Sequence, residues 1–268
     1  MSARSTPNRV DEMSFPRSVR IVGPGRAGGA LCDALALSGW NVLEPVRRGD
    51  DVSGAAQGVD LVIVATPDSA IADVASRIEP VSTTVIAHMS GSLGLDVLGD
   101  QPMRAAIHPL VPLPDRETGS VRLRENAWFA VAGNSSAALT LVGEVVTSLG
   151  GRSFTVADDQ RAAYHAAAAI ASNHLVALLG QAERVAKNAG IPFDAYLDLV
   201  RATVENVAEL GPAAALTGPA SRGDWATIDR HRAAIDESEL EVYDALVRAA
   251  RRLVAGDERG NDVSNDDV

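Results

Sequence analysis

A glycine-rich turn near the start of the chain constrains its fold more than any other feature. Residues 19–31 read as a short apolar strand, then Gly23-Pro24-Gly25-Arg26-Ala27-Gly28, then the beginning of a helix. In a Gly-x-Gly-x-x-Gly turn, the first glycine permits the tight bend and the second lets a pyrophosphate approach the backbone. The third lets the helix pack on the strand, and the helix N-terminus favours phosphate. The stretch predicts a dinucleotide-binding unit; a turn that binds nothing is the alternative.

The end of the second strand, expected near residues 40–46, predicts which dinucleotide is bound. An NAD site usually has an Asp or Glu there, bonded to the ribose 2′-OH. Here the strand runs into Arg47 and Arg48, whose guanidinium groups suit a 2′-phosphate. Glu44 precedes Pro45 and is expected to lie too early in the strand to reach the ribose. The pattern favours NADP over NAD, with a solvated loop as the alternative for the two arginines.

Composition excludes several classes of protein. The 268 residues carry 24 Lys and Arg against 35 Asp and Glu, and this net charge of −11 argues against a nucleic-acid surface. We expect no membrane span and no signal peptide. The single cysteine, Cys32, excludes an internal disulfide framework, so a cytoplasmic protein is expected. The five histidines do not have the spacing of zinc ligands, so no metal is expected.

The pattern of elements changes near residue 157. Before it, strands and helices alternate, with strands expected at 60–67, 83–88, 103–107, 128–131 and 153–156. After it, helices are expected at 158–187, 193–210, 225–235 and 238–255. The fold class is therefore α/β, a doubly wound parallel Rossmann sheet followed by an all-helical domain. The boundaries are a disordered arm (1–15), a Rossmann domain (16–157), a helical domain (158–255) and an acidic disordered tail (256–268).

Ligands of doubly wound sheets bind beyond the carboxyl ends of the strands. The residues that follow those strands are therefore candidate cofactor-binding residues. The nicotinamide is expected near Thr66, Pro67 and Ser90, and Ala65 is also expected to bind the cofactor. His108 follows a later strand and is a candidate substrate-binding residue. A structural role is the alternative for Ser90 and His108 alike.

One face of the first long helix carries the candidate catalytic residues. At about 100° per residue, His165 and Ser172 point the same way, and Asn173 lies about 80° from His165. Histidine titrates near neutral pH, so His165 is the candidate proton donor, and Ser172 and Asn173 would bind substrate oxygens. A tight helix–helix seam is the alternative. The only lysine, Lys187, lies about 33 Å further along the helix, so a lysine-based mechanism is not expected.

Three further residues are candidate substrate ligands. Tyr164 precedes His165 on the same helix. Arg222 could pair with a substrate carboxylate, because guanidinium makes bidentate bonds to it. Asp224 is the third candidate, with a helix cap before Trp225 as its alternative role.

Seven motifs in this order resemble a known family. They are Gly-Pro-Gly-Arg-Ala-Gly (23–28), Ala-Thr-Pro-Asp (65–68), His-Met-Ser-Gly-Ser (88–92), His-Pro-Leu (108–110), Tyr-His-Ala-Ala (164–167), Ser-Asn-His (172–174) and Leu-Thr-Gly-Pro-Ala-Ser-Arg-Gly-Asp (216–224). Over residues 18–255 the chain resembles bacterial Rossmann-like proteins with a C-terminal domain of uncharacterised function, which is similar to the helical domain of 6-phosphogluconate dehydrogenase. The resemblance implies an NADP-linked oxidoreductase related to pyrroline-5-carboxylate reductase and ketopantoate reductase, and a dimer formed by the helical domain. Ketopantoate reductases use a lysine that this sequence lacks.

These observations together predict an NADPH-dependent reductase of a small 2-keto acid, with 2-dehydropantoate as the specific candidate. Two alternatives stay open. One is a non-catalytic NADP-binding regulatory protein, and the other is an imine reductase of the pyrroline-5-carboxylate type.

Overall fold

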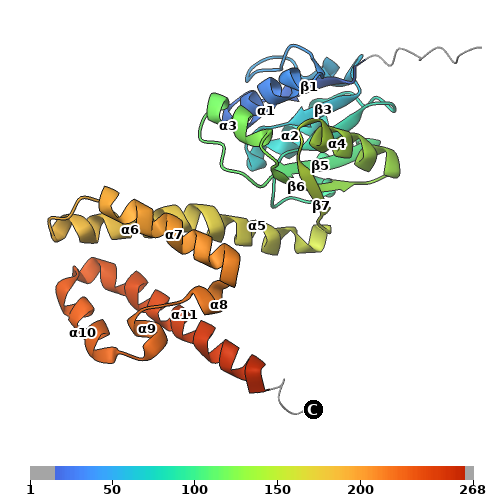
Figure 1. Cartoon of the computed structure of the whole chain (residues 1–268). Helices are drawn as coiled ribbons and strands as arrows, with labels where there is room; N and C mark the ends of the chain where they lie inside the picture. The colour runs from blue at the N-terminus through green and yellow to red at the C-terminus, as the bar shows by residue number, and fades with distance from the viewer. Residues whose placement is uncertain (1–15, 263–268) are drawn as a thin grey trace, which may run out of the picture. The chain divides into compact units, whose positions relative to one another are not determined.

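The computed structural model describes residues 16–262, and the chain divides into two compact units between Ser172 and Asn173 (Figure 1). The arm expected at 1–15 lies outside the described residues. The change from α/β to purely helical structure falls after residue 157, as the sequence indicates. The first unit nevertheless extends to Ser172, because the start of the long helix packs beside the sheet rather than with the later helices.

The first unit is built on one seven-stranded sheet with helices on both faces (Figure 1). The strands lie in the order β2-β1-β3-β4-β5-β6-β7. Their bounds are β1 Ser18–Val22, β2 Asn41–Val42, β3 Leu61–Val64, β4 Val85–His88, β5 Met103–Pro109, β6 Trp128–Gly133 and β7 Arg152–Thr155. The order reverses at β1, so the turn after β1 lies at the topological switch point, where such sheets bind ligands. The Rossmann class is confirmed, although β6 is antiparallel to β5.

The register of the strands sorts their side chains into two cores. Val19 of β1 pairs with Leu61 of β3, and Leu61 pairs with Val85 of β4. Because successive side chains of a strand point to opposite faces, these residues share one face and their neighbours share the other. Helices α1 (Arg26–Leu37) and α4 (Ser136–Ser148) pack on the first face, and α3 (Arg116–Leu123) packs against α1. Helix α2 (Asp68–Arg77) and the short turns η1 (Ser53–Ala56) and η2 (Leu95–Leu98) cover the second.

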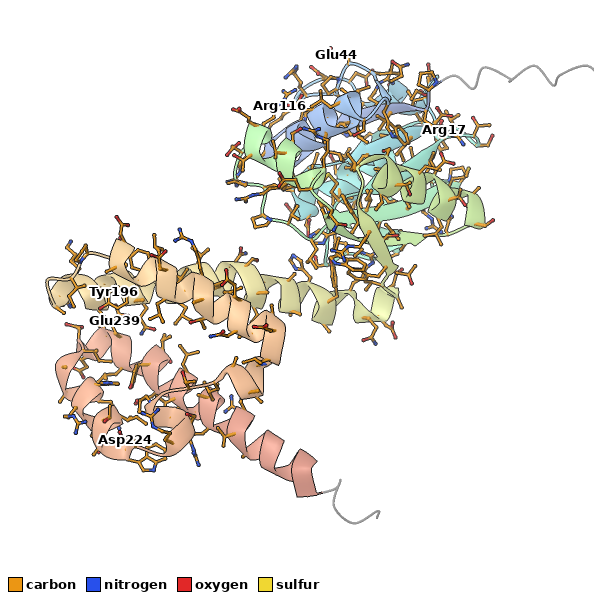
Figure 2. The ribbon with its side chains drawn as sticks, viewed as in Figure 1. Arg17, Glu44, Arg116, Tyr196, Asp224 and Glu239 are labelled. Carbon is orange, nitrogen blue, oxygen red and sulfur yellow. The ribbon has the colours of Figure 1, made fainter. Side chains whose placement is uncertain are left out.

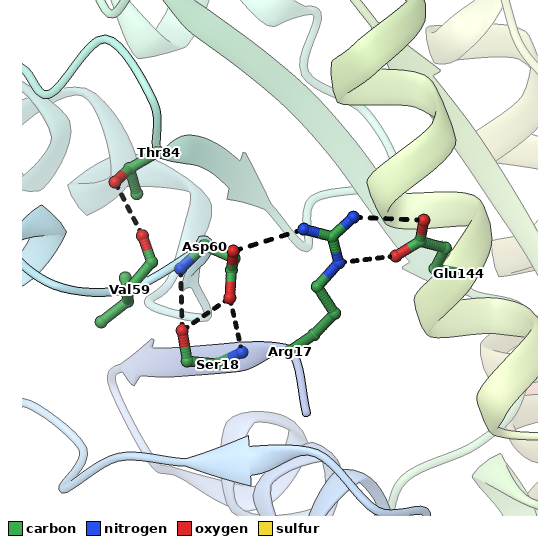
Figure 3. A network of polar contacts seen from close by, with 6 residues as sticks. All are labelled: Arg17, Ser18, Val59, Asp60, Thr84 and Glu144. Atoms are coloured by element: carbon green, nitrogen blue, oxygen red, sulfur yellow. Dashed lines mark hydrogen bonds and ion pairs between the residues drawn. The ribbon is translucent and has the colours of Figure 1, made fainter. Parts of the chain in front are cut away.

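Polar contacts tie the strands together at their amino ends (Figure 3). The Asp60 carboxylate, just before β3, accepts hydrogen bonds of 2.7 Å from both N–H and Oγ of Ser18 in β1. Arg17 donates to Asp60 and pairs with Glu144 of α4 at 3.0 Å. Thr84 Oγ1, just before β4, donates to the carbonyl of Val59 at 2.8 Å. These contacts join β1, β3 and α4 at the amino edge of the sheet.

A long helical stretch leads out of the first unit. It consists of a short turn, η3 (Asp158–Gln160), then α5 (Arg161–Ala169), a π-helix (Ile170–His174) and α6 (Leu175–Asn188). By length and composition, residues 158–188 pass as a membrane span, with a mean hydropathy of 1.2. This differs from the sequence expectation. One such helix is weak evidence for a span.

The second unit is purely helical within the described residues (Figure 1). After α6 come α7 Asp194–Leu210, α8 Pro212–Ala215, α9 Pro219–Arg222, α10 Trp225–Ala234 and α11 Glu237–Asp262. Helices α6 and α11 are joined by a hydrogen bond of 2.9 Å from Gln181 Nε2 to the carbonyl of Glu239, whose carboxylate also pairs with Arg184. The prediction of a disordered tail at 256–268 is wrong for residues 256–262, because α11 continues to Asp262. Residues 263–268 lie outside the described part of the chain.

Candidate functional site

The three glycines of the turn after β1 lie in three different environments. Gly23 has φ +87°, a conformation that side chains rarely adopt, and a Cβ there would lie 2.9 Å from Thr66 Cγ2. A Cβ on Gly28 would lie 2.4 Å from the carbonyl oxygen of Gly23, so the helix packs directly on the turn. Gly25 faces open space, with nothing within 4 Å of its Cβ position. The turn thus leaves room for a ligand at its second glycine.

The N-terminus of α1 has no protein cap. Gly25 is the N-cap residue, its first helical turn contains no acidic side chain, and no side chain accepts a hydrogen bond there. The first N–H groups of an α-helix have no partner within the helix. Those of Arg26 and Ala27 are therefore available to an anion, as in phosphate sites at helix N-termini. Pro24 precedes them in the turn and lines the same pocket.

A pocket of about 780 Å³ lies beside this turn. Its walls include Val22 to Gly25, the loop after β2 and the first turns of α2. The predicted cofactor residues that line it are Gly23, Pro24, Gly25, Arg47, Arg48, Ala65, Thr66 and Pro67. Thr66 Oγ1 is buried and has no hydrogen-bond partner among the described residues. The pocket is large enough for a nucleotide and brings the predicted residues together.

Three arginines line this pocket, and two of them, Arg47 and Arg48, are predicted from the sequence. Arg47 makes a loose ion pair of 3.6 Å with Glu44, which does not line the pocket, and both side chains are largely exposed. Arg48 is exposed. Arg77 reaches the pocket from the end of α2 and pairs with Asp73 at 3.3 Å. Exposed pairs of this kind are weak, so the guanidinium groups are free to bind an anion. Arg77 is identified only by its place in the pocket, which α2 lines together with the glycine turn.

Ser90 fixes the loop after β4. Its hydroxyl donates to Asp68 Oδ2 at 2.7 Å and accepts from the N–H groups of Ser92 and Leu93. Ser92 Oγ donates to the same carboxylate oxygen at 2.9 Å. Because the Ser90 side chain is buried and already bonded, any contact with a cofactor would come from its backbone.

Two histidines lie at the carboxyl ends of β4 and β5: His88 is buried and His108 is half-buried. His88 has no exposed surface; its Nδ1 accepts from the Ser90 N–H at 3.2 Å, and within residues 16–262 its Nε2 meets the geometric criteria for no hydrogen bond. Burial and the nearby charge of Arg161 lower the pKa of His88 to about 4. Burial, then His165 and Arg161, lower the pKa of His108 to about 4 as well. Both imidazoles are therefore neutral at pH 7.

His108 meets two candidate residues of α5. Its Nδ1 lies 2.6 Å from the hydroxyl of Tyr164, and its ring stands edge-on to that of His165, with the centroids 5.9 Å apart. Burial raises the pKa of Tyr164 to about 12, so its hydroxyl stays protonated. Gly91 permits this packing, because a Cβ there would lie 2.6 Å from His165 Cδ2. The structure thus brings together three predicted residues from two distant segments.

Arg161, which is not among the residues predicted from the sequence, begins α5 beside this group. Its side chain is fully buried, and its Nε pairs with Asp158 at 3.3 Å. Asp158 does not cap the helix; its carboxylate accepts from the N–H of Leu95 instead. No local pattern marks Arg161, because its burial depends on the loop after β4.

The other two predicted catalytic residues, Ser172 and Asn173, lie in the π-helix that follows α5, the helix of His165. The Ser172 hydroxyl donates to the carbonyl of Ala168, four residues earlier, at 2.7 Å. Asn173 is the first residue of the second unit. Because a π turn holds more residues than an α turn, the 100° spacing that aligned Ser172 with His165 does not hold across it.

Arg222 and Asp224 belong to the second unit, where Figure 2 labels Asp224. The Asp224 carboxylate accepts from N–H and Oγ1 of Thr227 and caps α10, which is its structural alternative. Arg222 is exposed at the end of α9. Among residues 16–262, no group of three or more His, Cys, Asp or Glu could hold a metal ion.

Comparison with known proteins bears on family and fold. Residues 127–250 match a family described as "Domain of unknown function (DUF2520)". This match confirms the resemblance to Rossmann-like proteins with a C-terminal domain of uncharacterised function. No curated protein sequence matches the chain.

Several solved structures have this fold. A protein of Bacteroides fragilis, provisionally named an NADP oxidoreductase, matches with TM-score 0.76 and 22% identity over 89% of this chain and 99% of its own. Pyrroline carboxylate reductase of Plasmodium falciparum with NADP bound matches with TM-score 0.61 and 13% identity over 90% and 99%. A reductive aminase of Aspergillus terreus in complex with NADPH and ethyl levulinate matches with TM-score 0.64 and 14% identity over 88% and 94%. The Rossmann unit followed by a helical unit is confirmed.

Proposed function

We propose that this protein is an NADP-dependent oxidoreductase that reduces a small 2-keto acid with NADPH. The observation that carries the proposal is the pocket beside the glycine turn. It combines an open Gly25, an uncapped helix N-terminus and two exposed arginines at the end of the second strand. These groups suit the pyrophosphate and the 2′-phosphate of NADP. The similar structures with bound NADP or NADPH support the same cofactor.

When bound, NADPH would supply the hydride, and the chain must supply a proton. His165 is the proposed proton donor. It is partly exposed beside His108, whereas His88 and His108 are neutral at pH 7 because burial lowers the pKa of each. The protonated hydroxyl of Tyr164 would hold the substrate carbonyl, with His108 holding that hydroxyl in place. Ser172, Asn173, Arg222 and Asp224 remain proposed substrate ligands.

The specific substrate proposed is 2-dehydropantoate, which rests on the resemblance to ketopantoate reductases. A screen of NADPH oxidation by the purified full-length protein would test it, with 2-dehydropantoate, other 2-keto acids and cyclic imines as acceptors. Turnover of a keto acid supports the proposal. NADPH binding without turnover of any acceptor would favour the regulatory alternative.

An imine reductase is the second candidate function. The similarity to pyrroline carboxylate reductase and reductive aminase favours it, because both act on carbon–nitrogen double bonds, as their names imply. The same screen separates the two candidates, since a preference for 1-pyrroline-5-carboxylate over every keto acid would replace the first with the second.

Two variants test the assigned roles. Arg47→Ala is expected to weaken the binding of NADPH more than the binding of NADH, because only NADPH carries the 2′-phosphate. Equal losses of affinity for the two would argue against NADP as the cofactor. His165→Ala is expected to lose turnover and keep cofactor affinity. Unchanged turnover would remove His165 from the mechanism.

We also propose that the protein is a cytoplasmic homodimer joined by the helical unit. Large apolar side chains of that unit are exposed in the single chain, among them Val176 at 70% and Leu199 at 63%. A second copy of the chain would cover them. Light scattering on the purified protein would give twice the chain mass, and a monomer at micromolar concentration would contradict this.

A further inference from the structure

Arg161 is a charged side chain with unmet hydrogen-bonding capacity. It has no exposed surface, and its Nε has one partner, Asp158 Oδ1 at 3.3 Å. Its terminal nitrogens, Nη1 and Nη2, are buried and have no hydrogen-bond partner among the described residues. Buried donors without partners cost free energy, and nearly all are paired in native proteins. The guanidinium therefore has room for a hydrogen-bond acceptor that residues 16–262 do not supply.

This side chain lies within the candidate site. Tyr164 and His165 follow Arg161 by three and four residues and so lie on the same face of α5. Its positive charge adds to burial in lowering the pKa of His88, and it contributes in the same direction at His108. Asp68 and Asp158 are the acidic groups that act on these histidines.

We propose that Arg161 binds the carboxylate of the substrate through Nη1 and Nη2. Two terminal nitrogens of one guanidinium form a planar edge that matches the two oxygens of a carboxylate. Asp68 and Asp158 already supply negative charge here, which favours a singly charged carboxylate over a phosphate dianion. The carbonyl of a 2-keto acid would then lie close to Tyr164 and His165. Arg161 would thereby select acids over neutral ketones.

The carboxylate must displace a neighbour to reach this group, because the guanidinium is enclosed. Tyr164 and His165 are only half-buried, whereas His88 is fully buried. We expect these two α5 side chains to be the ones that move when a carboxylate enters. By contrast, the exposed Arg222 has access to water and has no buried, unmet donor.

Calorimetric titration of the full-length protein with oxamate tests the proposal. Oxamate is a monoanion shaped like a 2-keto acid, and oxamide is its neutral counterpart. The wild type is expected to bind oxamate and not oxamide. Arg161→Met is expected to weaken oxamate binding by at least about tenfold, and Arg161→Lys by less, because lysine keeps the charge but loses the fork. Arg201→Met is the matched control, since Arg201 is exposed and pairs with Asp198 on α7.

Thermal unfolding separates binding from folding. Arg161→Met places an apolar chain of similar length in a buried site, so its melting temperature is expected to equal or exceed that of the wild type. If Arg161→Met fails to fold, Arg161→Lys carries the test. The proposal is overturned if the wild type does not bind oxamate, if inorganic phosphate binds more tightly, or if the loss follows Arg222→Met and not the Arg161 variants.

The inference rests on the proposed reductase function only for the reaction that follows binding. NADPH affinity, measured by fluorescence on the same samples, keeps the two distinguishable. Arg161-dependent oxamate binding without any NADPH binding would reject the reductase and retain the carboxylate site. NADPH turnover of a keto acid with an unchanged KM in Arg161→Met would do the reverse.

Discussion

Gly25 and Gly28 lie in the same turn of the chain, but a methyl group at each would have different consequences. Gly25→Ala is expected to leave the melting temperature unchanged and to weaken NADPH binding, because its Cβ enters open space at the proposed pyrophosphate site. Gly28→Ala is expected to lose about 1–3 kcal/mol of unfolding free energy, because its Cβ meets the Gly23 carbonyl oxygen at 2.4 Å. Thermal unfolding and NADPH titration of both variants check this. Equal stability losses would contradict the proposed division of roles.

The lowered pKa values of His88 and His108 predict a loss of stability in mild acid. Their pKa values are about 4 in the folded chain and near 6.5 when unfolded. The unfolded state therefore takes up protons first, so stability is full above pH 6.5 and falls as the pH drops towards 4. Each shift corresponds to on the order of 3 kcal/mol. Urea unfolding between pH 7.5 and 4.5 measures it. His108→Gln should flatten the slope and the exposed His174→Gln should not; a flat wild-type profile would contradict the prediction.

Residues that act through local backbone geometry were predictable, and residues placed by distant packing were not. The roles of Gly23, Gly25 and Gly28 follow from a short motif whose surroundings the structure now shows. Arg77 and Arg161 carry no such motif. Arg77 shares a pocket with the distant glycine turn, and Arg161 pairs with Asp158, whose carboxylate is bonded to the distant Leu95.

At the scale of elements, the buried strands were found because their apolar runs are continuous. The direction of β6 was not. A parallel neighbour needs a crossover over the sheet, but α3, which joins β5 to β6, packs against α1 instead. The chain therefore re-enters at the carboxyl edge, where the Leu110 N–H donates to the Trp128 carbonyl at 2.8 Å. The π-helix could not be predicted either, because the alanines that precede it do not show which face of the helix is buried.

Among the polar contacts at the amino ends of the strands, the hydrogen bonds of Asp60 should stabilise the fold more than the ion pair of Glu144. Asp60→Ala is expected to cost about 1–3 kcal/mol of unfolding free energy, because it removes the acceptor of two 2.7 Å hydrogen bonds that join β1 to β3. Glu144→Ala removes only an exposed ion pair with Arg17 and should cost less than about 1 kcal/mol. Chemical denaturation of both variants measures the difference. A larger loss for Glu144→Ala would show that the ion pair, rather than the strand contact, holds this edge.

For the whole molecule, the position of the pocket determines which unit a cofactor stabilises. Every residue that lines it belongs to the first unit. A ligand that binds only the folded state stabilises it by about 2.7 kcal/mol at a hundredfold excess over its Kd. NADPH should therefore raise the unfolding temperature of the sheet-bearing unit, as scanning calorimetry would show. Arg47→Ala should shrink this rise for NADPH and leave that for NADH unchanged. A rise confined to the helical unit would place the cofactor elsewhere, because the glycine turn, α1 and all three pocket arginines precede Asn173.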